Sequence, residues 1–592
     1  MNRQEKDILK ALMKETYINQ RILAEKSGYS LGTVNKCVKV LVEDGYLDEQ
    51  MRLTDKAIMD IQEKSPQSAI ILAAGYGMRM VPLNSEIPKG LLEVHGEPLI
   101  ERLIKQLHEV HIYDIYIVVG FMKEAYEYLI DKYDVQLVVN KEYAIKNNLH
   151  SIKLVTSKLS NCYVMPCDVW CKYNPFQEHE LYSWYMVSDT YNKDSYVRLN
   201  RKKELIPVSE CENGNAMIGI AYLLEEDADV VRARVKKMCE SPRFDNSFWE
   251  EVLYEKNKFY LQANVVSSKE VVEINTYEQL RELDCNSNQL KTEAIQTICE
   301  ALEIRNEDIT NITLLKKGMT NRSFLFTGKH KRYIMRIPGE GTEQLINRTE
   351  EALVYQQVLG RQISDRVVYI NPKNGYKITE YWDNVRACDA TNRLDLEKCM
   401  KKLREFHESE YQVDHEFDIY EKIDFYESLW ENNVSIYKDY NETKRNIQSL
   451  RGYVDSQTKK KVLTHIDAVP DNFLFVRTPD GEEDVRLIDW EYAGMQDPHV
   501  DVAMFCIYAL YNKEEIDRLI DIYFENDCSQ STRMKIYCYI AMCGLLWSNW
   551  CEYKRQLGVD FGEYSLRQYR YAKEFYRIVK KELEIMEKNN GI

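Results

Sequence analysis

The pattern of apolar and polar positions in the first 65 residues predicts a short run of helices followed by a hairpin. Apolar residues recur there with a period near 3.6, as on one face of an amphipathic helix. Gly28 is expected to form the turn between two helices, and Ser30 is expected to cap the N-terminus of the following helix. Residues 47–53 are expected to form the two strands of a small wing. We therefore place an α+β domain at residues 1–65.

The pattern changes after residue 65. The run SAIILAAGYGMRM is a buried apolar strand that leads straight into a glycine-bearing loop. Further apolar runs at IYDIYIVVGF, VQLVV and NCYVMPCD alternate with helical stretches such as PLIERLIKQLHEV. This alternation predicts a doubly wound, parallel α/β sheet, whose ligands lie beyond the carboxyl ends of the strands. We place this second domain at residues 66–285.

Residues 286–592 predict a third domain of different character. A helix at EAIQTICEALE precedes apolar strands at ITLLKKG, RSFLFTG and KRYIMRIP, which suit a small β-rich lobe. From residue 395 onward the pattern is mainly helical, apart from a loop-and-strand block at 462–490. A small sheet lobe joined to a helical lobe is the α+β layout of kinase-like phosphotransferases. The chain is therefore expected to be multidomain.

Length and composition agree with this organisation. A chain of 592 residues is too long for a single core. Its net charge of −16 argues against nucleic acid as the main partner of the whole molecule. The N-terminus lacks the apolar core of a secretory signal, no run is apolar enough to span a membrane, and the 15 cysteines form no regular framework. We expect a cytoplasmic protein with reduced thiols, and the oligomeric state stays open.

The first domain resembles the winged helix-turn-helix domain of bacterial regulators. In such a unit the second helix of the motif would present Thr33, Asn35, Lys36 and Lys39 to a major groove. Residues 1–64 contain 11 basic and 11 acidic side chains, however, and affinity for DNA comes largely from phosphate neutralisation. The sequence therefore supports DNA binding and a dimerisation or regulatory role of this domain equally.

The loop after the first strand of the second domain has the residues that a triphosphate needs. Glycines let backbone N–H groups approach the phosphates, where a Cβ would clash. The residues expected to bind the nucleotide are Ala73, Ala74, Gly75 and Gly77. With Pro88-Lys89 and GEPLIE further on, the run resembles the nucleotidyltransferases that make NDP-sugars and CDP-alcohols. The resemblance implies that Arg79 and Lys89 act on the triphosphate as pyrophosphate leaves.

The same resemblance implies a Mg²⁺ site. Asp168 ends the strand in VMPCD, at the edge where such proteins hold the metal. The family offers a second carboxylate in a run of the type E-I-D-T, which here reads Glu273-Ile274-Asn275-Thr276. Asparagine can ligate through its carbonyl oxygen but brings no charge. We therefore expect weaker metal binding, or compensation by Glu273.

Two segments narrow the substrate of this domain. The run Asn147-Asn148-Leu149-His150-Ser151 resembles a loop of phosphocholine cytidylyltransferases, and RFDNSFWEEVL matches the same subgroup. An aromatic ring with nearby carboxylates suits a quaternary ammonium group. Asn148 and Trp249 are therefore expected to bind the substrate. Further candidates are Trp170, Tyr191, Asp245 and Glu250, although packing explains any one aromatic equally well.

The third domain contains the most specific motif of the chain. His465-Ile466-Asp467-Ala468-Val469-Pro470-Asp471-Asn472 precedes a strand, and Ile488-Asp489-Trp490-Glu491 follows. This spacing resembles choline and aminoglycoside kinases. Phosphoryl transfer needs a carboxylate that deprotonates the attacking hydroxyl and ligands for a metal on the phosphates. Asp467 fits the first role, Asn472 and Asp489 fit the second, and His465 is expected to brace the loop.

Upstream and downstream residues extend this resemblance. Gly318-Met319-Thr320-Asn321-Arg322-Ser323 resembles the hairpin that covers the phosphates. Arg336 stands where kinases carry a strand lysine, as in the bacterial choline-kinase subgroup, with Glu351 as its expected partner. Trp547 and Trp550 lie three apart on one helix face. With Glu491 and Tyr492, and Tyr569 as a further candidate, they are expected to enclose a trimethylammonium group, although a bare WxxW is more often core.

Taken together, the resemblances imply a bifunctional enzyme. One half would phosphorylate choline with ATP, and the other would couple phosphocholine to CTP, giving CDP-choline and pyrophosphate, with Mg²⁺ in both. Ethanolamine or another amino-alcohol is an alternative substrate. A second alternative is a DNA-binding regulator whose enzyme-like domains sense choline or nucleotide. CTP selectivity, substrate channelling and the role of the winged helix stay open.

Overall fold

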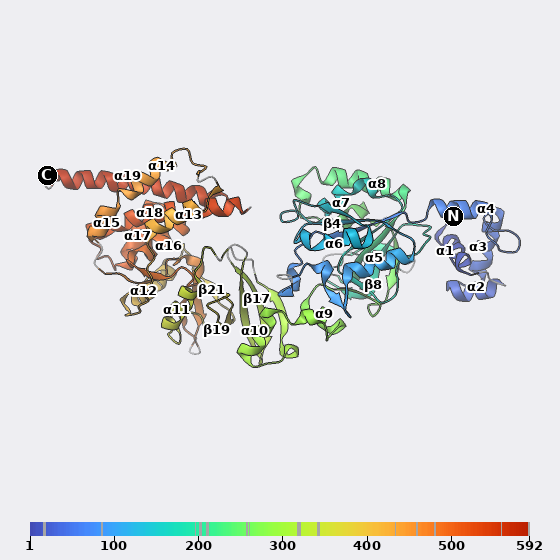
Figure 1. The fold of residues 1–592 in the computed structure, drawn as a ribbon, viewed down its shortest axis with the longest axis horizontal. Coiled ribbons are helices and arrows are strands. Elements are labelled where there is room, and N and C mark those ends of the chain that lie inside the picture. The colour runs from blue at the N-terminus through green and yellow to red at the C-terminus, as the bar shows by residue number, and fades with distance from the viewer. Residues whose placement is uncertain are drawn as a thin grey trace. The chain divides into compact units, whose positions relative to one another are not determined.

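The structure is a computed structural model of the 592-residue chain, and it divides the chain into two compact units, Met1–Gln296 and Thr297–Ile592. Each unit is described by itself (Figure 1). The described residues are all except 16–18, 84–86, 194, 196, 201–203, 209–211, 256–257, 260, 316–320, 340–341, 343, 432–433, 458–459, 479–480, 558, 560 and 590–592. Residues 1–65 and 66–285, which the sequence pattern separates, share the first unit.

The first unit begins with the expected helix-turn-helix. Its helices are α1 (Arg3–Lys14), α2 (Gln20–Ser27), α3 (Leu31–Glu43) and α4 (Asp55–Glu63). Gly28 takes a left-handed conformation at the end of α2, and the Ser30 side chain accepts from the Thr33 amide at the start of α3, as the sequence predicts. The wing is reduced to one bridge between Leu47 and Leu53, because Asp48 turns the chain by accepting two amide hydrogens.

Helix α1 fastens this domain to the rest of the unit. The Arg3 guanidinium donates to the Gln262 side chain at 3.1 Å and to the Ala263 carbonyl at 3.2 Å. Lys10 forms an ion pair with the buried Glu180, and the Tyr182 hydroxyl donates to Asp7 at 2.8 Å. The helix that would read DNA, α3, keeps Asn35, Lys36 and Lys39 exposed.

The rest of the unit is built on a seven-stranded sheet of order β14-β8-β11-β6-β1-β4-β5. These strands are β14 (Gln262–Val266), β8 (Trp184–Asn192), β11 (Gly214–Leu223), β6 (Cys162–Pro166), β1 (Ser68–Ala73), β4 (Asp114–Val119) and β5 (Gln136–Val139). The four strands from β6 to β5 run parallel, as predicted. The sheet as a whole is mixed, because β11 lies antiparallel to both of its neighbours.

Both faces of this sheet are covered by helices. Successive residues of β1 point to opposite faces. Ala69 and Ile71 therefore pack with the apolar side of α5 (Leu99–Glu109), whereas Ile70 packs with α7 (Asn148–Leu154) and α8 (Glu225–Met238). Figure 1 shows α7 and α8 on the opposite side of the sheet from α5.

The shorter elements of this unit complete the fold. They are β2 (Glu93–Val94), β3 (Glu97–Pro98), α6 (Tyr128–Tyr133), β7 (Val169–Cys171), β9 (Val197–Leu199), β10 (Leu205–Pro207), β12 (Tyr254–Glu255), β13 (Lys258–Phe259), β15 (Val271–Glu273) and α9 (Tyr277–Leu283). Helix α10 (Glu293–Leu302), which the run EAIQTICEALE predicts, spans the boundary between the two units. The pairing of β15 with β7 places Glu273 opposite Val169, beside Asp168. The carboxyl ends of β1 and β6 and the end of β15 thus meet at one edge of the sheet.

The second unit has the predicted small sheet lobe. Its antiparallel sheet has the order β16-β17-β18-β20-β19. The strands are β16 (Thr310–Leu314), β17 (Asn321–Gly328), β18 (Lys331–Pro338), β20 (Lys377–Glu380) and β19 (Val367–Ile370), and α11 (Arg348–Val358) accompanies them. The expected strands RSFLFTG and KRYIMRIP correspond to β17 and β18, and the start of ITLLKKG lies in β16, whereas its residues 316–318 lie outside the described residues.

The remainder of this unit is mainly helical. Its helices are α12 (Arg393–Glu408), α13 (Ile419–Ser428), α14 (Tyr440–Gln448), α15 (Arg451–Gln457), α16 (His499–Tyr508), α17 (Lys513–Tyr523), α18 (Gln530–Gln556) and α19 (Glu563–Asn589). Short strands interrupt them at β21 (Arg386–Ala387), β22 (Val462–Thr464), β23 (Phe473–Arg477), β24 (Glu483–Leu487) and β25 (Gly494–Gln496). Among the described residues, no helix has the length and apolar character needed to cross a membrane.

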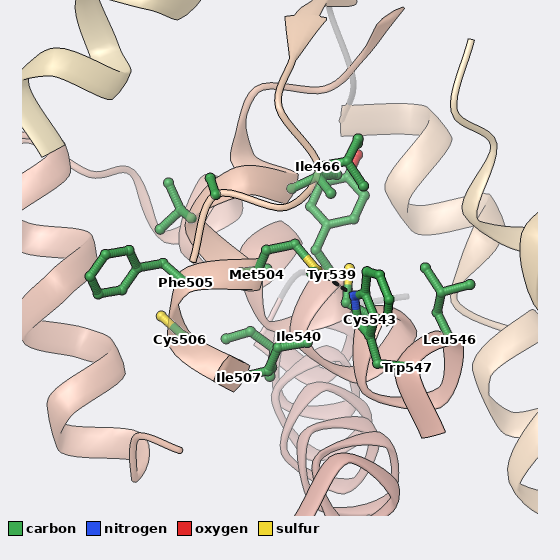
Figure 2. Packing of buried hydrophobic residues seen from close by; sticks show 14 of the residues in the cluster. Ile466, Met504, Phe505, Cys506, Ile507, Tyr539, Ile540, Cys543, Leu546 and Trp547 are labelled. Atoms are coloured by element: carbon green, nitrogen blue, oxygen red, sulfur yellow. Dashed lines mark hydrogen bonds between the residues drawn. The ribbon is translucent and has the colours of Figure 1, made fainter. Parts of the chain in front are cut away.

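The core of this lobe holds α18 rigidly. Helix α18 is buried on nearly all sides between Met534 and Lys554. Figure 2 shows Met504 of α16 against Trp547 of α18, and the Trp547 indole N–H donates to the Met504 sulfur at 2.9 Å. One edge of the Trp547 ring is therefore anchored in the core, and this contact fixes the orientation of the ring.

Two candidate active sites

The first candidate site is a cleft of about 940 Å³ at the carboxyl edge of the seven-stranded sheet. Four of the predicted site residues line it, namely Arg79, Asn148, Glu273 and Asn275. The Asn275 side-chain oxygen accepts from the Lys89 ammonium at 2.8 Å and from the Arg79 guanidinium at 3.2 Å. Lys89 also forms an ion pair with Asp168. The structure thus brings Arg79, Lys89 and Asp168 together at Asn275, as their proposed roles require.

The glycine loop lies beside these groups. Ala73 ends β1, and the Ala74 carbonyl accepts from the Phe121 amide at 3.1 Å, which fixes the start of the loop. Gly77 has φ +59°, a left-handed conformation that a side chain would strain, and a Cβ there would approach the Lys89 side chain to 3.4 Å. Gly75 has open space around it. The loop therefore leaves room for a ligand to reach the backbone.

The carboxylates of this cleft suit a hard divalent cation. One oxygen of Asp168 is buried without a hydrogen-bond partner. Burial, and then the negative charge of Asp168, raise the pKa of Glu273 to about 7. Among the described residues, no group of three or more His, Cys, Asp or Glu side chains is arranged so that it could hold a metal ion. Mg²⁺ needs only one or two carboxylates when phosphates and waters supply the rest. Asp168, Glu273 and the Asn275 carbonyl oxygen therefore fit Mg²⁺.

One residue that the sequence predicts to bind the alcohol substrate, Trp249, does not line this cleft. The Asn148 side chain accepts from the Trp249 amide at 2.7 Å. Trp249 itself is 1% exposed and packs in the core, so its ring does not line the cleft. Tyr185 and Phe248 line it instead, together with Glu250, which is one of the further candidates from the sequence. The run RFDNSFWEEVL therefore does contribute to the cleft, but through Phe248 and Glu250 on either side of Trp249.

The other candidates in this domain are distributed as follows. The Tyr185 hydroxyl donates to Glu250 at 3.2 Å, and burial raises the pKa of Glu250 to about 7. Trp170 lies against Arg102, and Tyr191 is largely exposed. Neither ring is part of the cleft lining. Asp245 lies 3.1 Å from the buried His150 imidazole, at the base of α7.

The second candidate site is a cleft of about 620 Å³ in the kinase-like unit. Its lining includes nine predicted residues, namely Asn321, Arg336, Asp467, Asn472, Asp489, Glu491, Tyr492, Trp547 and Trp550. Glu351 lies behind Arg336 and is joined to it by two hydrogen bonds. Gly318, Met319 and Thr320 lie outside the described residues. The motifs of this unit thus converge on a single cleft, although they are more than 200 residues apart in the chain.

The loop with Asp467 is held from both ends. The Asn472 amide donates to the Asp467 carboxylate at 3.1 Å and to its carbonyl at 2.9 Å. The buried His465 ring donates to the Ile488 carbonyl at 2.9 Å, and burial lowers its pKa to about 4. A neutral, buried imidazole in this position braces the loop. This placement agrees with the expected role of His465.

The carboxylates of this cleft repel one another. Burial, followed by the charges of Asp489 and Glu491, raises the pKa of Asp467 to about 8. Burial and the charge of Glu491 likewise raise the pKa of Asp489 to about 7. Such a cluster favours a bound cation, and Asn472 and Asp489 supply the oxygen ligands that a phosphate-bound Mg²⁺ takes in kinases.

Aromatic rings form the other end of this cleft. The rings of Tyr492 and Trp547 meet edge-on at 5.4 Å, and those of Trp547 and Trp550 at 5.5 Å. Tyr508 and Tyr564 also line the cleft, with their centroids 5.9 Å apart. These two are residues that the sequence reasoning missed, because they lie outside any motif. Tyr569 does not line the cleft, and its hydroxyl donates to Asp439 at 2.8 Å.

The two sites define a class of protein. The chain joins an α/β nucleotidyltransferase domain to a two-lobed kinase-type phosphotransferase, behind a winged helix-turn-helix. Residues 69–173 match the MobA-like NTP transferase domain family, residues 312–543 match the choline/ethanolamine kinase family, and residues 1–48 match a winged helix-turn-helix DNA-binding family. All three resemblances noted in the sequence are therefore confirmed, and the chain is an enzyme of the transferase class.

Individual relatives identify the family more closely. Choline-phosphate cytidylyltransferase of Streptococcus pneumoniae is 32% identical over 227 residues, which are 37% of this chain and 99% of that protein. The chain belongs, through its central part, to the family of this cytidylyltransferase. Protein LicA of Haemophilus influenzae is 27% identical over 270 residues, 42% of this chain and 96% of its own. A crystal structure of choline kinase LicA from Streptococcus pneumoniae is 29% identical, with a TM-score of 0.42 over 48% of this chain and 96% of its own.

Proposed function

We propose that this chain makes CDP-choline in two steps. ATP would phosphorylate choline in the second unit, and CTP would then react with phosphocholine in the first unit, with release of pyrophosphate. The observation that carries the proposal is the composition of the kinase-like cleft. There Asp467, Asn472 and Asp489 share one cavity with the aromatic rings of Tyr492, Trp547 and Trp550.

In the first step, Asp467 would accept the proton of the choline hydroxyl while its oxygen attacks the γ-phosphorus of ATP, and ADP would leave. Asn472 holds the Asp467 carboxylate in place for this transfer. Asn472 and Asp489 would hold Mg²⁺, which supplies positive charge against the phosphates. The trimethylammonium group would lie against the aromatic rings, because their faces attract a cation that cannot donate hydrogen bonds.

In the second step, a phosphate oxygen of phosphocholine would attack the α-phosphorus of CTP and the bond to pyrophosphate would break. Arg79 and Lys89 lie next to the metal-binding residues, where they would stabilise the charge on the departing pyrophosphate. Asp168, Glu273 and the Asn275 oxygen would hold Mg²⁺. Asn148, Tyr185 and Glu250 would bind the choline part of the substrate.

The first test is ³¹P NMR of the purified protein with choline, ATP, CTP and Mg²⁺. Phosphocholine followed by CDP-choline and pyrophosphate would support both steps. Phosphocholine alone would leave the cytidylyl transfer unsupported, with Asn275 as the first position to examine. Ethanolamine in place of choline tests the alternative substrate, because a primary ammonium would favour carboxylates over the rings. Both reactions use nucleotides of the cytoplasm, where we place the protein.

One observation favours a second function for the N-terminal domain. Helix α3 keeps its polar side chains Asn35, Lys36 and Lys39 exposed, although α1 is packed against the sheet. This exposed face of α3 could enter a major groove of DNA. A gel shift with the upstream region of the protein's own gene tests this function, and retardation that disappears in Lys36→Ala/Lys39→Ala would support it.

A further inference from the structure

Five buried polar side chains form a connected cluster between the two lobes of the kinase-like unit. We call it the inter-lobe cluster, and its members are Asn321, Arg336, Arg348, Glu351 and Glu491. None of them is more than 9% exposed. They come from three separate segments, namely the start of β17, the region of β18 and α11, and the segment after Asp489. The cluster therefore joins the small lobe to the metal-binding segment.

Arg348 is the centre of this cluster. One guanidinium nitrogen donates to Glu351 at 2.9 Å and to Glu491 at 3.1 Å. The other terminal nitrogen donates to the Asn321 side-chain oxygen at 3.1 Å. The Asn321 amide in turn donates to the same Glu491 oxygen at 3.0 Å. Arg348 thus makes a direct contact with each of the three segments.

The position is shaped for an arginine. Gly375 has φ +69°, and a Cβ there would lie 2.7 Å from the Cδ and 2.8 Å from the Nε of Arg348. The missing side chain at Gly375 therefore makes room for the stem of Arg348. A planar guanidinium can serve three acceptors at fixed angles, whereas a lysine would offer a single point charge. Among the residues the structure describes, the second arginine of the cluster, Arg336, serves Glu351 and the Gly375 carbonyl.

These contacts indicate a different role for Glu491 from the one that the sequence predicts. The sequence assigns this residue to the trimethylammonium cage, but its Oε2 accepts from Asn321 and Arg348. Both donors belong to the small lobe, which contains the expected phosphate-covering hairpin. Glu491 also lies two residues from Asp489, so any displacement of Glu491 moves the expected metal ligand. Two guanidinium groups balance the two carboxylates Glu351 and Glu491, and the cluster needs no cation from the substrate to be neutral.

We infer that Arg348 is a positioning residue for the nucleotide. It fixes Glu491, and through it the Asp489 segment, against β17, the strand that follows the expected phosphate-covering hairpin. This inference rests on the proposed kinase activity. It assigns the inter-lobe cluster to the recognition of a metal-bound nucleoside triphosphate and leaves recognition of the amino-alcohol to the aromatic rings.

The test is steady-state kinetics of the full chain with ATP and choline varied separately. We expect Arg348→Met to raise KM for ATP by at least about tenfold, because Glu491 loses the arginine at 3.1 Å and keeps the more distant Arg336 at 4.0 Å. KM for choline should change less than about threefold, and Arg348→Lys should restore part of the loss. Trp547→Leu is the matched control, because it alters the aromatic end of the same cleft. It should raise KM for choline and leave KM for ATP nearly unchanged.

A second variant guards against loss of folding in Arg348→Met. Glu491→Gln keeps the shape and removes the charge, and we expect the same selective rise in KM for ATP. The double variant Arg348→Met/Glu491→Gln should be less impaired than Arg348→Met alone, because the buried charge that lost its hydrogen-bonded arginine is removed as well. An equal rise in KM for choline and ATP, or a rise for choline alone, would overturn the inference. If the wild-type chain transfers no phosphate from ATP to choline, the proposed function itself fails and the inference fails with it.

Discussion

Asn275 offers the sharpest test of the cytidylyltransferase site. It stands where the family has a carboxylate, and its side-chain oxygen accepts from Lys89 at 2.8 Å and from Arg79 at 3.2 Å. Asp168 and Glu273 are its acidic neighbours. Asn275→Asp changes charge with almost no change in shape. We expect this variant to need less Mg²⁺ for half-maximal cytidylyl transfer than the wild-type chain.

The size of the effect follows from the charges. Two unit charges about 4 Å apart interact by about 4 kcal/mol at an effective dielectric constant near 20, so a divalent ion would gain up to about 8 kcal/mol. Most of this gain is offset, because the new carboxylate gives up its water when it binds the metal. We expect a net gain of about 2 kcal/mol, which lowers the half-saturating Mg²⁺ concentration about 30-fold.

The same reasoning gives a pH dependence. Glu273 has a pKa raised to about 7, so at pH 6 it is largely protonated and must lose a proton before it binds a metal. The Mg²⁺ requirement of the wild-type chain should therefore fall as the pH rises through 7. In Asn275→Asp the additional negative charge raises the pKa of Glu273 further. The advantage of the variant should accordingly be larger at pH 8 than at pH 6.

The assay is release of pyrophosphate from CTP and phosphocholine at varied Mg²⁺ concentration. Asn192→Asp is the matched control, because Asn192 lines the same cleft but is not bonded to Lys89 or Arg79 in any contact the structure gives. Phosphorylation of choline by the same protein checks that the chain is folded. The reasoning is refuted if Asn275→Asp leaves the Mg²⁺ dependence unchanged, or if Asn192→Asp shifts it equally.

Three further predictions concern other parts of the chain. Asp467→Asn should lower choline phosphorylation by about 10²–10⁴-fold, measured as ADP formation, while cytidylyl transfer from supplied phosphocholine stays intact. Because burial and neighbouring charges raise the pKa of Asp467 to about 8, kcat/KM of the kinase step should fall as the pH drops from 9 to 6, and a flat profile would contradict this role. Lys10→Met should destabilise the first unit by about 3 kcal/mol in thermal unfolding, because Glu180 is 1% exposed and would lose its ion-pair partner while it keeps the hydrogen bond from the Tyr163 hydroxyl. Lys10→Met/Glu180→Gln should recover part of that loss.

The sequence predicted what local chemistry determines. The caps at Ser30 and Gly28 follow from side-chain oxygens and a missing Cβ. The alternation of apolar strands and amphipathic helices predicted the α/β domain, because it requires both faces of the sheet to be covered. The motif residues of that domain converge on one cleft, because the carboxyl ends of neighbouring parallel strands meet at one edge of the sheet.

Residues whose role depends on tertiary packing could not be predicted from local sequence patterns. Tyr508 and Tyr564 come from different helices, and nothing in their neighbouring sequence indicates a shared cleft. The burial of Trp249 could not be predicted, because a resemblance to a motif does not decide which of two adjacent residues of a 3₁₀ turn faces the cleft. The antiparallel direction of β11 likewise depends on how a long connection returns to the sheet, which residue patterns do not specify.

The two departures from family patterns differ in what they remove from the site. At position 336 the charge is kept, and the fork of the arginine reaches both Glu351 and a backbone carbonyl, so a lysine would lose one of these contacts. At position 275 a charge is lost, but the amide oxygen still accepts from two cations that would otherwise face each other. The first change preserves the electrostatics of the kinase-like cleft, whereas the second weakens only the attraction for a metal. If the cleft that contains Asn275 is the less active of the two, the cause should therefore lie in Mg²⁺ affinity rather than in the placement of Arg79 and Lys89.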